Sequence, residues 1–223
     1  TPEYSSAASD VYKRQGSNGE ATISGKLDVN SSTSKAGDIE ITGKELNLVS
    51  AKLSADGKEG GGKILIGGDW QGKGDLLQST YTSIDKNSVL SASATESGAG
   101  GTIVAWSNIK DSNSVTSVYG TLTAKGIDGD GGQIETSGAV LNYDGIKVDT
   151  SSVSGGYGNW LLDPTNLTVG SSEASTYVSN LASTNVNVTA DNTITVNSAI
   201  SYGGGRSNAV SYTHLRAHET PLY

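Results

Sequence analysis

The feature that most constrains the fold is a short unit that recurs along the chain. Each copy begins with glycine, continues with one other residue and then places apolar residues in partial alternation. Five copies begin at Gly37 (GDIEITG), Gly62 (GKILIGG), Gly101 (GTIVAWS), Gly132 (GQIETSG) and Gly158 (GNWLLDP). Successive starts are 25, 39, 31 and 26 residues apart. Self-similarity at a few tens of residues is typical of solenoids, propellers and other repeat arrays.

The alternation favours a β-solenoid, because successive side chains of a strand point to opposite faces. Coils that stack on one another bury such apolar rows only against their neighbours. The residues expected to point inward are Ile39, Ile41, Ile64, Ile66 and Ile103. The residues expected to point outward are Asp38, Glu40, Lys63 and Thr102. Glycine is expected where the chain turns a corner with positive φ. The shorter spacings between successive units then correspond to one coil. The longer spacings correspond to a coil with a loop insertion, such as one around Trp70–Thr82.

Helical patterns are almost absent, which excludes a parallel architecture of alternating strands and helices. The best candidate is Glu173–Ser183, where Ala174, Tyr177, Val178 and Leu181 follow helical spacing. This pattern predicts a short surface helix. A β-propeller or β-sandwich remains the structural alternative, although both more often contain hairpin turns of the Asn-Gly kind.

Composition narrows the class of protein further. Only 17% of the 223 residues are charged, and the 30 glycines with many Ser, Thr and Val suit short strands joined by tight turns. The formal net charge of −8, without a cluster of Lys or Arg, argues against nucleic acid as a partner. There is no apolar run of about 18 residues, so we expect no membrane-spanning segment. The absence of cysteine excludes disulfides and thiolate metal sites.

The two ends of the chain are related to each other through one oligonucleotide. The codons GAT GTG TAT AAG AGA CAG encode Asp10–Gln15, and the reverse complement contains GTC TCT TAT ACA CAT, which encodes Val210–His214. We therefore interpret residues 1–15 and 210–223 as translated sequencing adapter and residues 16–209 as a β-helix shaft fragment. His214 and His218 have the spacing of half a zinc site on a helix, but the glutamate of the catalytic zinc motif does not follow the first histidine.

Several polar residues are candidates for a site, each with a structural alternative. Asp128 and Asp130 lie in a Gly-rich loop and offer oxygen ligands that calcium prefers, but calcium repeats recur and this motif occurs once, so a solvated turn is favoured. Acid–base chemistry on a polysaccharide would need carboxylates that converge from adjacent coils. The carboxylates considered for that role are Asp144, Asp149 and Asp163.

Tyrosines are the candidates for a binding surface. Exposed rings could serve as stacking platforms for glycans, but half-buried rings with a structural role at coil corners are favoured. The tyrosines considered are Tyr119, Tyr143, Tyr157 and Tyr177. Asn166 and Asn187 begin glycosylation sequons, which Ser/Thr/Asn-rich chains also produce by chance.

Several segments together resemble filamentous-haemagglutinin-like large exoproteins, which are secreted bacterial adhesins of the two-partner secretion system. The segments are GGDWQGKGDLLQSTYTSIDKNSVLSASA, GGTIVAWSN, VYGTLTAKG, GGQIETSGAVLNYDGIKVDT and GNWLLDPTNLTVG, between about Gly37 and Ile200. The resemblance implies a right-handed parallel β-helix that is secreted or displayed on the bacterial surface. It implies passage through a dedicated outer-membrane transporter, and attachment to host-cell or surface receptors or glycans.

Within this interpretation the Trp-Leu-Leu of GNWLLDP is a core segment, Asp163-Pro164 is a corner, and Leu167 and Val169 belong to the next strand. We expect no catalytic residues, no cofactor and no metal site, and therefore no enzyme. The rival hypotheses are a β-helix enzyme that acts on polysaccharides and the structural stalk of a toxin-delivery exoprotein.

Overall fold

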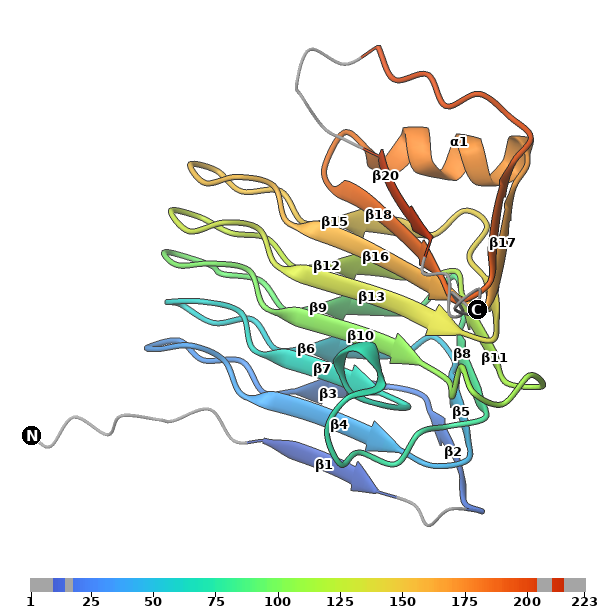
Figure 1. Cartoon of the computed structure of the whole chain (residues 1–223). Helices are drawn as coiled ribbons and strands as arrows, with labels where there is room; N and C mark the ends of the chain where they lie inside the picture. Colours follow the sequence, from blue (N-terminus) through green and yellow to red (C-terminus); the bar gives the residue numbers. More distant parts are fainter. Residues whose placement is uncertain (1–9, 15–17, 204–209, 215–223) are drawn as a thin grey trace, which may run out of the picture.

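The computed structural model describes residues 10–14, 18–203 and 210–214. It is an all-β parallel β-helix with one α-helix, as the repeats predict (Figure 1). Its three main sheets, here called A, B and C, consist of parallel strands. Five successive coils each supply one strand to sheet B, then one to sheet C, then one to sheet A.

The strands have these bounds. Sheet A contains, in spatial order, β1 (Val11–Arg14), β4 (Asp38–Thr42), β7 (Lys63–Ile66), β10 (Thr102–Trp106), β13 (Gln133–Gly138), β16 (Asn159–Pro164), β18 (Asn185–Ala190) and β20 (Val210–His214). Sheet B contains β2 (Glu20–Ile23), β5 (Glu45–Leu48), β8 (Tyr81–Ile84), β11 (Val115–Val118) and β14 (Val140–Asn142). Sheet C contains β3 (Lys26–Asp28), β6 (Lys52–Ser54), β9 (Val89–Ser91), β12 (Thr121–Thr123) and β15 (Lys147–Asp149). A separate pair joins β17 (Asn166–Val169) to β19 (Thr193–Val196).

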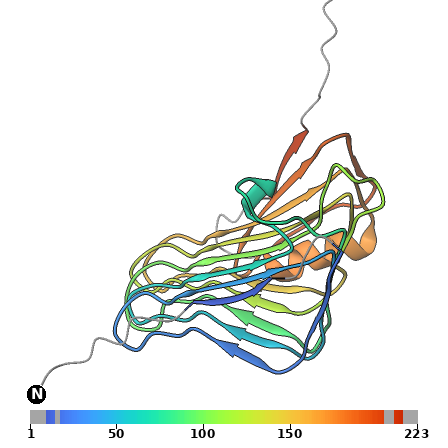
Figure 2. The same cartoon turned by 90° about the horizontal axis from the view of Figure 1, so that it is seen from below.

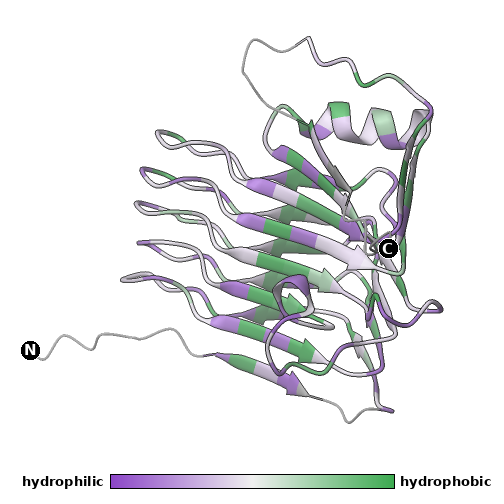
Figure 3. Cartoon of the chain, viewed as in Figure 1, coloured by the Kyte–Doolittle hydropathy of each residue, from purple (hydrophilic) through white to green (hydrophobic). Residues whose placement is uncertain are grey.

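The five recurring units of the sequence form β4, β7, β10, β13 and β16, which lie side by side in sheet A. Their inward rows are in register; one runs through Ile39, Ile64, Ile103, Ile134 and Trp160. All five side chains are completely buried, which confirms the predicted inward faces. Figure 3 shows the apolar positions of sheet A aligned from coil to coil.

The two longest intervals between units, of 39 and 31 residues, contain loop insertions. Residues 67–80 separate β7 from β8 and include the 3-10 turn η1 (Trp70–Gly72), which lies outside the coils (Figure 2). Residues 107–114 separate β10 from β11. The predicted insertion around Trp70–Thr82 is therefore confirmed in position, but Tyr81 and Thr82 already belong to β8.

The glycines that begin the units serve a different purpose from the one expected. Gly62 has no positive φ; instead its backbone lies so close to the preceding coil that an added Cβ would be 1.9 Å from the carbonyl oxygen of Gly37. The same close approach recurs at Gly101, Gly132 and Gly158. Positive φ is found at other corner glycines, such as Gly60.

Replacing Gly62 with alanine should therefore prevent adjacent coils from pairing at this corner. We expect Gly62→Ala to lower the free energy of unfolding by about 3 kcal/mol or more, because the obstacle is backbone that cannot move aside. Chemical denaturation of the full chain measures this loss. Gly203→Ala is the control, since an added Cβ there meets no atom within 4 Å, and an equal loss in both variants would contradict the explanation.

The helix α1 (Ser171–Asn180) follows β17 and begins two residues before the predicted segment. Its first turn is closed by the side chain of Glu173, which accepts a hydrogen bond of 2.9 Å from the backbone N–H of Gly170. The side chains of Ala174 and Tyr177, and of Leu181 just after the helix, are buried. The helix is thus more than a surface element, because this face covers the end of the hydrophobic interior (Figure 1). Nowhere in residues 10–14, 18–203 and 210–214 is a helix long and apolar enough to cross a membrane.

Asn180, the last residue of α1, occupies the place that a next strand of sheet C would take. Its side-chain oxygen accepts a hydrogen bond of 2.6 Å from the backbone N–H of Val148, and its amide nitrogen donates one of 3.1 Å to the carbonyl of Ile146. These are backbone groups at the edge of β15, which has no strand beyond it in sheet C. Sheet C therefore ends at the helix, whereas sheet A continues through β18.

We expect Asn180→Ala to lower the free energy of unfolding by about 2–4 kcal/mol, because it removes the partners of two buried backbone groups, the N–H of Val148 and the carbonyl of Ile146. Asn192→Ala is a matched control. The Asn192 side chain is exposed and donates a hydrogen bond of 2.9 Å to the side chain of Asn166, so the expected loss is below about 0.5 kcal/mol. Similar losses in the two variants, measured by urea denaturation, would show that Asn180 does not close the edge.

The outermost strands of sheet A, β1 and β20, belong to the segments that we interpret as adapter. Both pair in parallel and in register, with Val11 opposite Ile39 and Tyr212 opposite Val188. An open sheet edge accepts a strand through main-chain hydrogen bonds. The adapter origin of residues 1–15 and 210–223 stays a prediction. His218 and the side chain of His214 lie outside the described part of the chain.

Candidate functional site

The three carboxylates considered for acid–base chemistry each bind a different partner. Asp144 accepts a hydrogen bond of 3.0 Å from the hydroxyl of Ser172. Asp149 forms an ion pair of 2.7 Å with Lys125 on the outer face of sheet C. Asp163 lies on the outer face of sheet A and accepts a hydrogen bond from Thr189. The structure therefore does not bring the three together in one groove.

The carboxylates of the Gly-rich loop are used to hold neighbouring coils. The side chain of Asp128 accepts a hydrogen bond from the backbone N–H of Gly98, and that of Asp130 accepts one of 2.8 Å from Gly156. Asp128 therefore binds the preceding coil and Asp130 the following one. Both lie in the row of loops that projects from the stack (Figure 1). Within the residues that the structure describes, no three His, Asp or Glu side chains are grouped to hold a metal ion.

Two of the four tyrosines are not available as binding platforms. Tyr143 and Tyr177 are buried and stack at 5.9 Å between ring centroids, and their hydroxyls are 2.6 Å apart. Both rings meet Trp160 edge-on, and burial raises the pKa of each phenol. The burial of this pair agrees with the structural alternative and not with an exposed platform. Tyr119 is exposed and Tyr157 is half-buried, at separate corners of the coils.

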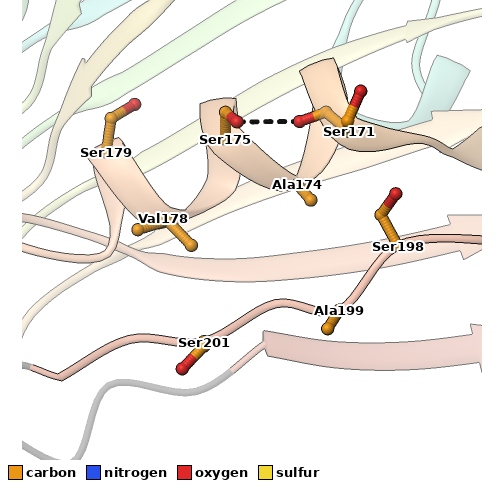
Figure 4. Close-up of a pocket in the computed structure, with 8 residues that line it drawn as sticks. All are labelled: Ser171, Ala174, Ser175, Val178, Ser179, Ser198, Ala199 and Ser201. Carbon is orange, nitrogen blue, oxygen red and sulfur yellow. Dashed lines mark hydrogen bonds between the residues drawn. The ribbon is translucent and has the colours of Figure 1, made fainter.

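A shallow hollow lies between α1 and residues 198–201 (Figure 4). Its walls are small side chains, and the hydroxyl of Ser175 is turned back to the carbonyl of Ser171 at 2.7 Å. The lining residues are Ser171, Ala174, Ser175, Val178, Ser179, Ser198, Ala199 and Ser201. Because none of them ionises, the hollow offers neither an acid, a base nor a metal ligand.

A second groove follows the outer face of sheet C beside the end of α1. It contains the Lys125–Asp149 ion pair, the exposed Lys147 and several hydroxyl groups. The ion pair neutralises the charges of its two members. The groove can therefore form hydrogen bonds with a polar ligand, but it lacks a nucleophile with an adjacent base.

The one carboxylate with an unusual environment is Glu135, which the sequence patterns did not single out. It lies on β13 at an outward position of sheet A, yet its side chain is completely buried. Residues 68–78 cover it. One carboxylate oxygen accepts a hydrogen bond of 2.7 Å from the backbone N–H of Gln71, and the other accepts one of 2.9 Å from the hydroxyl of Ser137.

The pKa of Glu135 is raised to about 7, mainly by burial and to a smaller extent by the nearby carboxylates Asp163 and Asp69. The hydrogen bonds from Gln71 and Ser137 stabilise the ionised form and act in the opposite direction. The pKa of Asp163 is also raised, because it is partly buried. The outer face of sheet A thus contains two carboxyl groups on adjacent strands that both hold their protons unusually well.

An apolar cluster on the same face anchors the covering segment. It consists of Leu65, Val104 and Trp106, against which Trp70, Leu76 and Ile109 pack. The backbone of Gly68 and Gly72 lies directly on the indole of Trp106, where an added Cβ would come within 2.5 and 2.4 Å of ring atoms. The indole N–H also donates a hydrogen bond of 3.2 Å to the side chain of Gln78. These contacts hold residues 68–78 over Glu135.

No family model matches the chain, and no curated protein matches it either.

We expect Trp106→Ala to release residues 68–78 while the stacked coils remain folded. Cleavage by trypsin after the exposed Lys73 should become about tenfold faster or more, because losing about 1.4 kcal/mol of packing is enough for that change. Mass spectrometry of timed digests measures the rate. Tyr119→Ala removes an exposed ring elsewhere and should leave the rate unchanged; equal acceleration by both would refute the anchoring role.

Proposed function

We propose that the chain is part of the shaft of a secreted bacterial adhesin of the filamentous-haemagglutinin type. The observation that supports this most is the run of five coils with in-register inner rows, because a regular stack makes a rod that can be lengthened by adding coils. Its insertions lie outside the coils, where a partner can reach them. The sequence resemblance between Gly37 and Ile200 supports the same assignment.

In this proposal the rod forms after export through an outer-membrane transporter of the two-partner type. The exposed edge of each coil offers unpaired N–H and C=O groups, on which the next coil can form. The absence of cysteine is compatible with export as an unfolded chain, since no disulfide can close a loop before passage. Attachment to host-cell or surface receptors or glycans would then involve the outer faces and corner loops.

The proposal is tested by attaching the purified full chain to beads and counting the beads that adhere to epithelial cells and to abiotic surfaces. We expect adhesion well above that of beads coated with an inert protein. Gly62→Ala, which disrupts the pairing of coils, should abolish it, whereas Gly203→Ala should not. Absence of adhesion by the folded chain to either surface would count against the adhesive role.

A polysaccharide-active enzyme is the second candidate, because Glu135 and Asp163 lie on adjacent strands and both have a raised pKa. An acid and a base on neighbouring coils could cleave a glycosidic bond. The complete burial of Glu135 argues against substrate access. Incubation with a panel of polysaccharides, followed by measurement of new reducing ends, should detect no product; product that Glu135→Gln abolishes would favour the enzyme.

A further inference from the structure

Residues 68–78 cover Glu135 from outside sheet A. In sheet A the outward positions of β13 are Gln133, Glu135 and Ser137, and Gln133 at the start of the strand is partly exposed. Glu135 would be on the surface in the same way if residues 68–78 did not cover it. The segment is held above it by the backbone N–H of Gln71 and by the packing on Trp106.

We propose that residues 68–78 are a pH-controlled cover, which stays closed over the outer face of sheet A while Glu135 is protonated and opens when Glu135 ionises. This inference goes beyond the adhesive role and does not depend on it.

The groups that face Glu135 leave an ionised carboxylate without a counter-charge. The neighbouring strand β16 presents Asp163, and the cover presents Asp69; both are acids. On β10, the facing residues Val104 and Trp106 are apolar. The cover contains one cation, Lys73, but its ammonium donates to the side chain of Gln71 at 2.8 Å.

Among ion pairs between the described residues, none includes Glu135. The cover also contains Asp75, which is exposed and adds further negative charge. Ionised Glu135 is therefore stabilised only by the hydrogen bonds from Gln71 and Ser137. Opening would hydrate the carboxylate and move it away from Asp69.

The direction of the pH effect follows from the raised pKa. With the cover closed, burial raises the pKa of Glu135 from 4.5 to about 7; with the cover open, the carboxyl is hydrated and its pKa returns towards the ordinary value. The ratio of closed to open protein is then highest and constant below about pH 4.5. It falls about tenfold for each pH unit until about pH 7, a total of roughly 300-fold.

Opening changes the chemistry of the surface. The apolar side chains of Leu65, Val104 and Trp106, which are now buried or nearly so, would reach solvent together with a negative charge at Glu135. One face of the rod would then change from a polar loop to an apolar patch beside a carboxylate as the pH rises through neutrality.

The test is hydrogen exchange of the full chain, followed by NMR at the backbone N–H of Gln71 and the indole N–H of Trp106 between pH 4.5 and 8. After correction for intrinsic exchange, protection at both positions should fall by up to roughly 300-fold across this range. The backbone N–H of Ile103, in the paired interior of sheet A, should keep its protection and so show that the coils stay folded.

Glu135→Gln preserves the size of the side chain and removes its ionisation, so protection at Gln71 should stay high at every pH. The matched control is Glu59→Gln, which changes an exposed residue in the corner loop before β7, at the opposite end of that strand from the cover, and should behave as the wild type. Protection that does not change with pH in the wild type, or that still falls in Glu135→Gln, would overturn the proposal. Direct titration of the Glu135 carboxyl carbon in the wild type provides a second measurement: a midpoint near 4.5 would also overturn it.

Discussion

The parallel hydrogen bonds that join each strand to its counterpart in the next coil determine how every coil is built. Because partners are in register, the same position in each coil faces the same way, and an apolar residue in one coil requires an apolar residue in the next. The row from Ile39 to Trp160 illustrates this requirement. The close approach of Gly62 to Gly37 follows from the same pairing, because the backbones of two adjacent coils lie in direct contact at this corner.

The same constraint explains how so polar a chain forms an interior. Where insertions leave the stack, buried hydroxyl side chains bind a carbonyl near the end of the next strand of sheet A along the chain. Ser79 and Thr82 both donate to the carbonyl of Trp106, and Thr116 repeats this contact one coil later at Ser137. No buried side-chain nitrogen or oxygen in the described ranges lacks a hydrogen-bond partner. Serine and threonine therefore contribute to the interior instead of weakening it.

Local pattern was enough to predict the parallel β-helix, the inward rows of sheet A and the location of α1, because each depends on periodicity within a few residues. The burial of Glu135 could not be predicted in this way. Alternation correctly places it on the outward face, and it is buried only because a segment more than fifty residues earlier folds over it. Tyr143 and Tyr177 are similar, since their burial depends on how α1 packs against the end of the core.

The alignment of the hydrogen bonds between coils has a mechanical consequence. These bonds lie along the stack, so a pulling force along the rod would load one coil boundary at a time, beginning at an open edge. A coil of 25 or 26 residues that peels away would shorten the rod by about 4.8 Å and release roughly 80–90 Å of extended chain. A tether of this kind lengthens under load and dissipates energy in small steps, while its covalent backbone stays intact.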